Sequence, residues 1–132
     1  MKFMLDTDIC IYVIRRRPES VLERLESHRI GEIGISVITL AELEYGASKS
    51  SNPTRNREAL EQFISSLEVA PFDRPATRAY GVIRATLEKK GYLIGSMDLL
   101  IAAHALSLGV RLVTNNVNEF KRVPGLRIEN WA

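Results

Sequence analysis

Short apolar runs alternate with longer stretches of helical periodicity along the whole chain. The apolar runs have the length and the aliphatic content of buried strands, and polar or glycine-containing segments bound them. One of the runs is interrupted by Pro71, which cannot donate a backbone hydrogen bond to a neighbouring strand. We predict strands at residues 3–5, 33–36, 69–72, 110–114 and 126–128.

Between these runs, apolar residues recur every three or four positions, which is typical of amphipathic helices. Either Thr7 or Asp8 is expected to cap the first helix, and either Ser36 or Thr39 the third. Pro18 suits a first helical turn, and Gly91 and Gly109 mark helix ends. We predict helices around residues 9–14, 18–25, 40–47, 53–67, 76–90 and 96–108, and a short helical turn at 119–120.

This alternation predicts an α/β fold in which helices flank a central, mostly parallel sheet, within one domain over residues 1–132. Parallel sheets bind ligands at the carboxyl ends of their strands. Asp6 ends the first predicted strand, and the polar run 114–116 ends the fourth. These two groups should therefore lie at the same edge of the sheet.

Three acidic residues are candidates for a site at this edge. Each has a simpler explanation alone: Asp6 as a helix cap, Glu42 as an exposed helix acid, and Asp98 as an acid favoured by the helix dipole. Together, however, clustered carboxylates repel one another unless a cation or proton intervenes. Ligands that are all oxygens favour Mg²⁺ or Mn²⁺ over zinc. The chain's histidines, His28 and His104, lack the spacing of metal ligands.

Composition and charge narrow the classes of protein to which the chain can belong. The chain has 132 residues, 45% of them hydrophobic and 26% charged, which excludes a disordered protein. No apolar run approaches the ~18 residues that span a bilayer, and the first residues do not form a leader, so we expect no membrane association. The single cysteine, Cys10, fits a reducing, cytoplasmic setting. Net charge is only +2, but basic residues clump at 15–17, 89–90 and 121–122, either as solvated helix ends or as phosphate contacts.

Four motifs in register resemble the PIN-domain ribonucleases, and specifically the VapC-type toxins of type II toxin–antitoxin systems. The motifs span nearly the whole chain: Met4-Leu5-Asp6-Thr7-Asp8-Ile9, Ile35-Ser36-Val37-Ile38-Thr39-Leu40-Ala41-Glu42-Leu43, Gly95-Ser96-Met97-Asp98-Leu99-Leu100-Ile101-Ala102-Ala103-His104-Ala105 and Leu112-Val113-Thr114-Asn115-Asn116-Val117-Asn118-Glu119-Phe120. The ending from Val123 to Trp131 also fits. The resemblance implies a PIN-like fold.

The resemblance also implies roles for individual residues. Asp6, Glu42 and Asp98 would be the catalytic acids, with Asp6 and Asp98 holding Mg²⁺, for which Mn²⁺ is a possible substitute. Glu42 would orient or deprotonate the attacking water or complete the metal shell. Thr114 would support Asp6, and Asn116 would position water or substrate. Two positions depart from the family: Asn116 replaces a common fourth acid, and Asp8 replaces a common Asn, either restoring that charge or capping the helix.

The function implied by the resemblance is a toxin that acts as a Mg²⁺-dependent endoribonuclease and leaves a 5′-phosphate and a 3′-hydroxyl. Initiator tRNA, cut in the anticodon loop, is the expected substrate. A VapB-type antitoxin is the expected partner, inserting a basic side chain among the carboxylates. We also expect a homodimer, a hetero-oligomer with the antitoxin, and contact with operator DNA only through the antitoxin.

Two other functions remain open at this point. The run Asp6-Thr7-Asp8 after an apolar strand matches phosphatases that form an aspartyl-phosphate, although Cys10 stands where they usually carry Thr. Alternatively, the chain is a non-catalytic module that keeps the PIN fold only to bind a partner, which the missing acid at Asn116 would permit.

Overall fold

Five short parallel strands form the centre of the molecule in the computed structural model, which describes residues 1–132. Their order is β3-β2-β1-β4-β5, and every neighbouring pair is parallel. Because neighbouring strands are parallel, each connection must return the chain from the carboxyl end of one strand to the amino end of the next, and helices form these connections. The elements are β1 (Phe3–Leu5), α1 (Thr7–Arg15), α2 (Glu19–Glu26), β2 (Ile33–Ser36), α3 (Val37–Ser48), α4 (Pro53–Ile64), β3 (Glu68–Ala70), α5 (Arg74–Lys89), α6 (Ser96–Leu108), β4 (Arg111–Val113), α7 (Val117–Phe120) and β5 (Ile128–Glu129).

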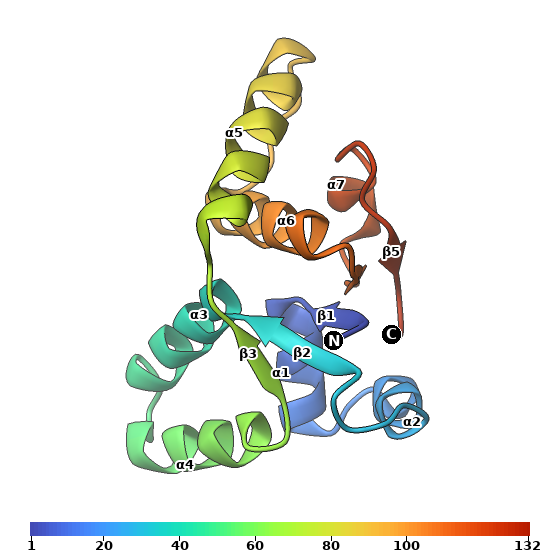
Figure 1. The fold of residues 1–132 in the computed structure, drawn as a ribbon. Helices are drawn as coiled ribbons and strands as arrows, with labels where there is room; N and C mark the ends of the chain where they lie inside the picture. Colours follow the sequence, from blue (N-terminus) through green and yellow to red (C-terminus); the bar gives the residue numbers. More distant parts are fainter.

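Helices cover both faces of this sheet, with α1, α2 and α4 on one side and α5 and α6 on the other (Figure 1). Side chains that alternate along a strand point to opposite faces. In β1, Phe3 and Leu5 therefore join the core under α1, while Met4 joins the core under α6. The predicted α/β fold with a parallel sheet and helices on both faces is confirmed.

The predicted element types are correct, but several boundaries and caps differ. The third strand ends at Ala70 rather than at residue 72, because Pro71 cannot donate to the ladder. The cap of α1 is Asp6, not Thr7 or Asp8, and Ser36, not Thr39, caps α3. Pro18 is the residue before α2 rather than part of its first turn. The last strand, Ile128–Glu129, begins only at the final residue of the predicted run.

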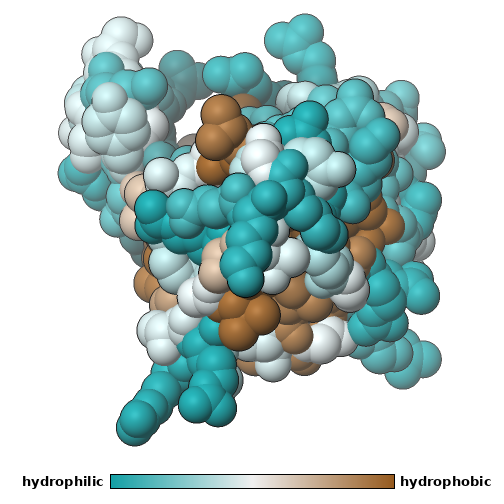
Figure 2. Space-filling model, turned by 90° about the horizontal axis from the view of Figure 1, so that it is seen from above, coloured by the Kyte–Doolittle hydropathy of each residue, from teal (hydrophilic) through white to brown (hydrophobic).

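The surface seen from the α5 end carries several separate apolar patches set among hydrophilic side chains (Figure 2). None of the helices combines the length and the apolar character needed to cross a bilayer.

Candidate active site

Asp6 lies at the carboxyl end of the central strand β1 and begins helix α1. Its Oδ1 accepts a hydrogen bond of 2.9 Å from the backbone N–H of Ile9, so the helix-cap explanation is correct for this oxygen. The side chain is almost completely buried. This burial raises the pKa of Asp6 to about 6, and the charges of Asp8 and Glu42 add to the effect, whereas hydrogen bonds from Thr114 and Ile9 oppose it. An acid this costly to ionise benefits from a nearby cation.

Glu42 reaches the same edge from helix α3. This helix starts directly after β2, because the Ser36 hydroxyl at the end of that strand accepts a 3.0 Å hydrogen bond from the Ile38 N–H. Glu42 is half-buried, and its Oε1 accepts a short hydrogen bond from the hydroxyl of Thr7. Thr7 follows Asp6, so the bond ties Glu42 to the start of α1.

Asp98 lies in the first turn of α6, as the sequence predicts, and is half-buried. Desolvation raises its pKa to about 7, and repulsion by Glu119, Glu42 and Asp6 contributes, in that order. The carboxylates of Asp6 at the end of β1, Glu42 on α3 and Glu119 on α7 are therefore close enough to Asp98 to disfavour its charged form. The three acids proposed from the sequence come together at one edge of the sheet.

The sequence interpretation missed Glu119, a fourth carboxylate of this cluster. Its Oε1 accepts a 2.9 Å hydrogen bond from the Gly95 N–H, just before α6. Its Oε2 accepts a short hydrogen bond from the Asn116 side-chain amide. A hydrogen bond between the side chains of Glu119 and Asp98 further raises the pKa of Asp98. Glu119 thus adds a fourth carboxylate to the cluster, next to Asn116. The available signal was its position three residues after Asn116 in a predicted helical turn.

The two supporting residues proposed from the sequence also lie in this cluster. Thr114 follows β4 and is fully buried. Its hydroxyl accepts a 2.9 Å hydrogen bond from the Asn116 N–H. A hydrogen bond between the Thr114 side chain and the Asp6 carboxylate lowers the pKa of Asp6. Asn116 orients Glu119. Asp8, in contrast, is exposed and caps nothing, so its interpretation as the helix cap is wrong. His104 is buried away from the acids against Ser36, with Nδ1 2.7 Å from Oγ.

The donor set fits a hard divalent cation, because every candidate ligand is a carboxylate or an amide oxygen. No three His, Cys, Asp or Glu side chains are already arranged to ligate one ion. Two of the carboxylates instead accept hydrogen bonds from the protein: Glu42 from Thr7, and Glu119 from Gly95 and Asn116.

The raised pKa values predict that the metal-free protein loses stability as pH rises. The folded protein retains protons on Asp6 and Asp98 up to about pH 6 and 7, whereas ordinary aspartates ionise near 3.8. The folded state therefore binds more protons than the unfolded state between these limits, and the free energy of unfolding falls as pH rises from about 4 to 7. We expect a fall of roughly 4–5 kcal/mol, of which ~3 kcal/mol comes from the buried Asp6 and ~1–2 kcal/mol from the half-exposed Asp98, whose contribution is reduced by solvent screening.

Urea denaturation in EDTA at pH 4, 5, 6, 7 and 8 measures this fall. Excess Mg²⁺ should remove most of it, because a bound cation replaces the protons. A free energy of unfolding that is independent of pH in EDTA, after correction for other titrating groups, would contradict the inferred repulsion.

Comparison with known proteins agrees with this geometry. Residues 3–126 match the family model described as the PIN domain. The chain is 50% identical over 132 residues to the tRNA(fMet)-specific endonuclease VapC of Salmonella typhimurium, covering 100% of this chain and 99% of the relative. It is 48% identical over 132 residues to ribonuclease VapC2 of Rickettsia felis, covering 99% and 98%.

Solved structures give the same result. The crystal structure of DNA-bound VapBC from Salmonella typhimurium superposes with a TM-score of 0.95 at 49% identity, covering 100% of this chain and 99% of that chain. VapBC2 from Rickettsia felis, bound to a promoter DNA fragment, gives 0.93 at 47% identity with complete coverage of both chains. Both the fold and the sequence are matched over the full length, and the chain belongs to the PIN-domain family and, within it, to the VapC ribonucleases.

Proposed function

We propose that this protein is the toxin of a type II toxin–antitoxin pair and that it hydrolyses RNA phosphodiester bonds with the help of Mg²⁺. The observation that carries the proposal is the convergence of Asp6, Glu42, Asp98 and Glu119: burial raises the pKa of Asp98 to about 7, and repulsion by the three other carboxylates contributes to the rise. PIN-domain ribonucleases are generally dependent on divalent metal ions. Mg²⁺, with Mn²⁺ as a substitute, suits the all-oxygen ligand set.

Each side chain has a distinct part in the proposed reaction. Asp6 and Asp98 hold the cation, and Glu119 adds the charge that Asn116 cannot supply. When bound, the ion polarises the scissile phosphate and makes water more acidic. Glu42 orients the attacking water and accepts its proton. Thr7 fixes Glu42, and Thr114 fixes Asp6, through the hydrogen bonds described above.

The proposed products are a 5′-phosphate and a 3′-hydroxyl. The water oxygen bonds to the phosphorus, the bond from phosphorus to the 3′-oxygen breaks, and the 3′-oxygen leaves and takes up a proton, so no 2′-hydroxyl is needed. Initiator tRNA, cut in its anticodon loop, is the proposed substrate. This choice is supported by relatives at 48% and 50% identity named tRNA(fMet)-specific endonuclease. An unpaired loop also offers bases that can leave the stack, which suits a protein that recognises single-stranded RNA.

The proposed partner is a VapB-type antitoxin, whose chain would place a basic side chain among the four carboxylates. Support comes from relatives solved as VapBC complexes with DNA. We propose that residues 1–132 act as one PIN domain, that the toxin forms a homodimer and a hetero-oligomer with its antitoxin, and that it meets operator DNA only through the antitoxin. We propose that it acts in the cytoplasm, because its proposed substrate is a tRNA. The phosphatase alternative has no support among these relatives, which are named ribonucleases.

Cleavage of purified bulk tRNA tests the proposal. We expect cleavage with Mg²⁺, none with EDTA, and recovery when Mg²⁺ or Mn²⁺ is restored in excess. Sequencing of the new 5′-phosphate ends should give a single position in the anticodon loop of initiator tRNA. Ends scattered over messenger RNA would contradict the substrate, and EDTA-resistant cleavage would contradict the metal dependence.

A further inference from the structure

Helices α3 and α6, which carry Glu42 and Asp98, are joined by a buried polar contact. Nδ1 of His104 on α6 lies 2.7 Å from the hydroxyl oxygen of Ser36, the residue that caps α3. We propose that His104 is a positioning residue for RNA cleavage, which holds the start of α3 through Ser36 so that Glu42 faces the attacking water. The inference rests on the proposed ribonuclease function and adds to it a residue that does not touch the reacting atoms.

The contact fixes the atom at which α3 begins. His104 and Ser36 are both fully buried, so neither side chain bonds to bulk solvent. The Ser36 oxygen accepts a 3.0 Å hydrogen bond from the Ile38 N–H, and the hydroxyl proton is therefore free to be donated. Donation of this proton to Nδ1 of His104 sets the direction of the hydroxyl group and so the position of the oxygen that caps the helix.

The imidazole has the charge state that this contact needs. Burial lowers the pKa of His104 below its usual value, and the Pro71 carbonyl and the charge of Asp73 oppose the shift only in part. The ring is thus neutral near pH 7 and carries one proton. If that proton were on Nδ1, the buried Ser36 hydroxyl would be left without an acceptor, so it belongs on Nε2.

The contact and the two acids lie at opposite ends of two helical segments of equal length. Residues 36–42 lead from Ser36 to Glu42 along α3, and residues 98–104 lead from Asp98 to His104 along α6. Each segment spans roughly 9 Å of helix axis. At the far ends, Glu42 lies close enough to Asp98 to raise its pKa. A shift at the contact therefore changes the separation of these carboxylates.

Packing alone does not account for a histidine at this place. Its neighbours on α6, Ala103 and Ala105, are buried and apolar, and its ring meets the Phe72 ring edge-on at 5.2 Å. An apolar side chain would fill the same volume without burying Nε2, which has no hydrogen-bond partner in good geometry. The histidine contributes direction, which a hydrogen bond has and an apolar contact lacks.

Substitutions of His104 separate direction from packing. His104→Leu keeps the volume and removes the acceptor, so kcat for tRNA cleavage should fall roughly 10- to 100-fold, the effect of a misplacement of about 1 Å. His104→Asn keeps an acceptor oxygen near the position of Nδ1 and should stay within about threefold of the parent. The Mg²⁺ concentration at half-maximal rate and KM for RNA should change less than about twofold, because Asp6 keeps its contact with Ile9 and α6 its contact with Glu119.

Ser36→Ala and hydrogen exchange test the same contact independently. Ser36→Ala should lower kcat at least as much as His104→Leu, and the double variant should lose little more than Ser36→Ala alone, because both act through one contact. Without any RNA, the Ile38 amide should exchange at least about tenfold faster in His104→Leu than in the parent or in His104→Asn. All rates are measured at a temperature below the onset of unfolding of every variant.

Several results would overturn the inference. These are a kcat of His104→Leu equal to that of the parent, additive losses in the double variant, or equal losses in His104→Asn and His104→Leu that follow their unfolding temperatures. Weaker Mg²⁺ affinity with an unchanged kcat at saturating Mg²⁺ would also overturn it, since His104 would then act on Asp98 and not on Glu42. If the parent enzyme cleaves no RNA under any metal condition, the proposed function itself fails and the positioning role fails with it.

Discussion

Asp98→Asn should reduce RNA cleavage about a thousandfold while leaving the protein folded. The change removes one carboxylate of the proposed metal site, and a metal ion supplies several kcal/mol of transition-state stabilisation, with each 1.36 kcal/mol equal to a factor of ten in rate. Asparagine has nearly the same shape as aspartate, so the packing of α6 is retained. Single-turnover cleavage of tRNA in saturating Mg²⁺ measures the loss.

The same substitution should raise the stability of the metal-free protein above pH 7 by roughly 1–2 kcal/mol, allowing for screening of a half-exposed carboxylate. The rise is expected because Glu119, Glu42 and Asp6 all repel a charge at Asp98. Glu58→Gln is a matched control, since Glu58 is exposed on α4 and away from the cluster; it should change neither activity nor stability. Lower stability in Asp98→Asn would indicate a structural role for this carboxylate, and undiminished cleavage would refute a catalytic one.

The positions of Asp6, Glu42 and Asp98 were predictable because each follows from a local rule. Asp6 ends an apolar strand, Asp98 starts an apolar helix, and Glu42 is an acid within an apolar helix. Parallel strands bring their carboxyl ends to one edge, so the sheet topology converts three local features into one site. The same rule explains why the order of elements predicted the fold without any long-range contact being known.

Glu119 was not predictable in this way, because its role depends on the direction in which the short helix α7 leaves β4. The distance from Glu119 Oε1 to Gly95 N, 2.9 Å, joins residues separated by 24 positions, which no local periodicity reports. The N-terminus of α6 lacks a side-chain cap of its own, since Gly95 has no side chain to accept from it. Glu119 meets that need, so one carboxylate both supports the helix that carries Asp98 and adds charge beside it.

The exact ends of strands and the identities of helix caps were also not predictable from the sequence. Asp6 and Asp8 are both good capping residues by type, and only the extended backbone at Asp6, with φ −78° and ψ 176°, decides between them. That geometry depends on pairing of β1 with β4 in the sheet. Sequence alone could therefore name both candidates but not choose the one whose carboxylate also serves the site.

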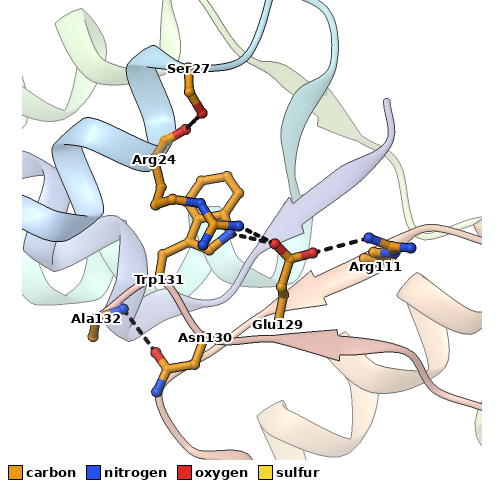
Figure 3. Close-up of polar contacts among 7 residues, drawn as sticks. All are labelled: Arg24, Ser27, Arg111, Glu129, Asn130, Trp131 and Ala132. Carbon is orange, nitrogen blue, oxygen red and sulfur yellow. Dashed lines mark hydrogen bonds and ion pairs between the residues drawn. The ribbon is translucent and has the colours of Figure 1, made fainter.

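The C-terminal residues form a second cluster, of aromatic and charged side chains, and the sequence did not indicate how much this cluster contributes to stability. Trp131 stacks on His28 with ring centres 5.2 Å apart and lies 5.5 Å from Phe3 of β1. Its indole N–H donates a 3.2 Å hydrogen bond to Glu129, which also pairs with Arg24 of α2 and with Arg111 of β4 (Figure 3). Residues 129–131 thus connect α2 to the edge of the sheet through ion pairs and aromatic packing.

Trp131→Ala should lower the free energy of unfolding by about 3–5 kcal/mol, the cost typical of emptying a buried aromatic position. Trp131 is only 2% exposed and belongs to the core on the α1 side of the sheet, so the cavity cannot be filled by surface side chains. The variant also leaves Glu129 without one of its donors, while Arg24 loses the ring it covers at 5.6 Å. Urea denaturation at pH 7 in Mg²⁺ measures the loss.

Two companion variants separate packing from charge in this cluster. Trp131→Phe keeps most of the buried ring and loses the N–H, so it should recover more than half of the stability. Glu129→Gln keeps the core and weakens ion pairs that are partly exposed, for which ~1 kcal/mol is expected. If Glu129→Gln proved as costly as Trp131→Ala, the ion pairs rather than the buried indole would hold the C-terminus to the sheet. The same core also packs against α1, which begins at Thr7 directly after its cap, Asp6. We therefore expect Trp131→Ala to lower the apparent affinity of the acidic cluster for Mg²⁺ as well.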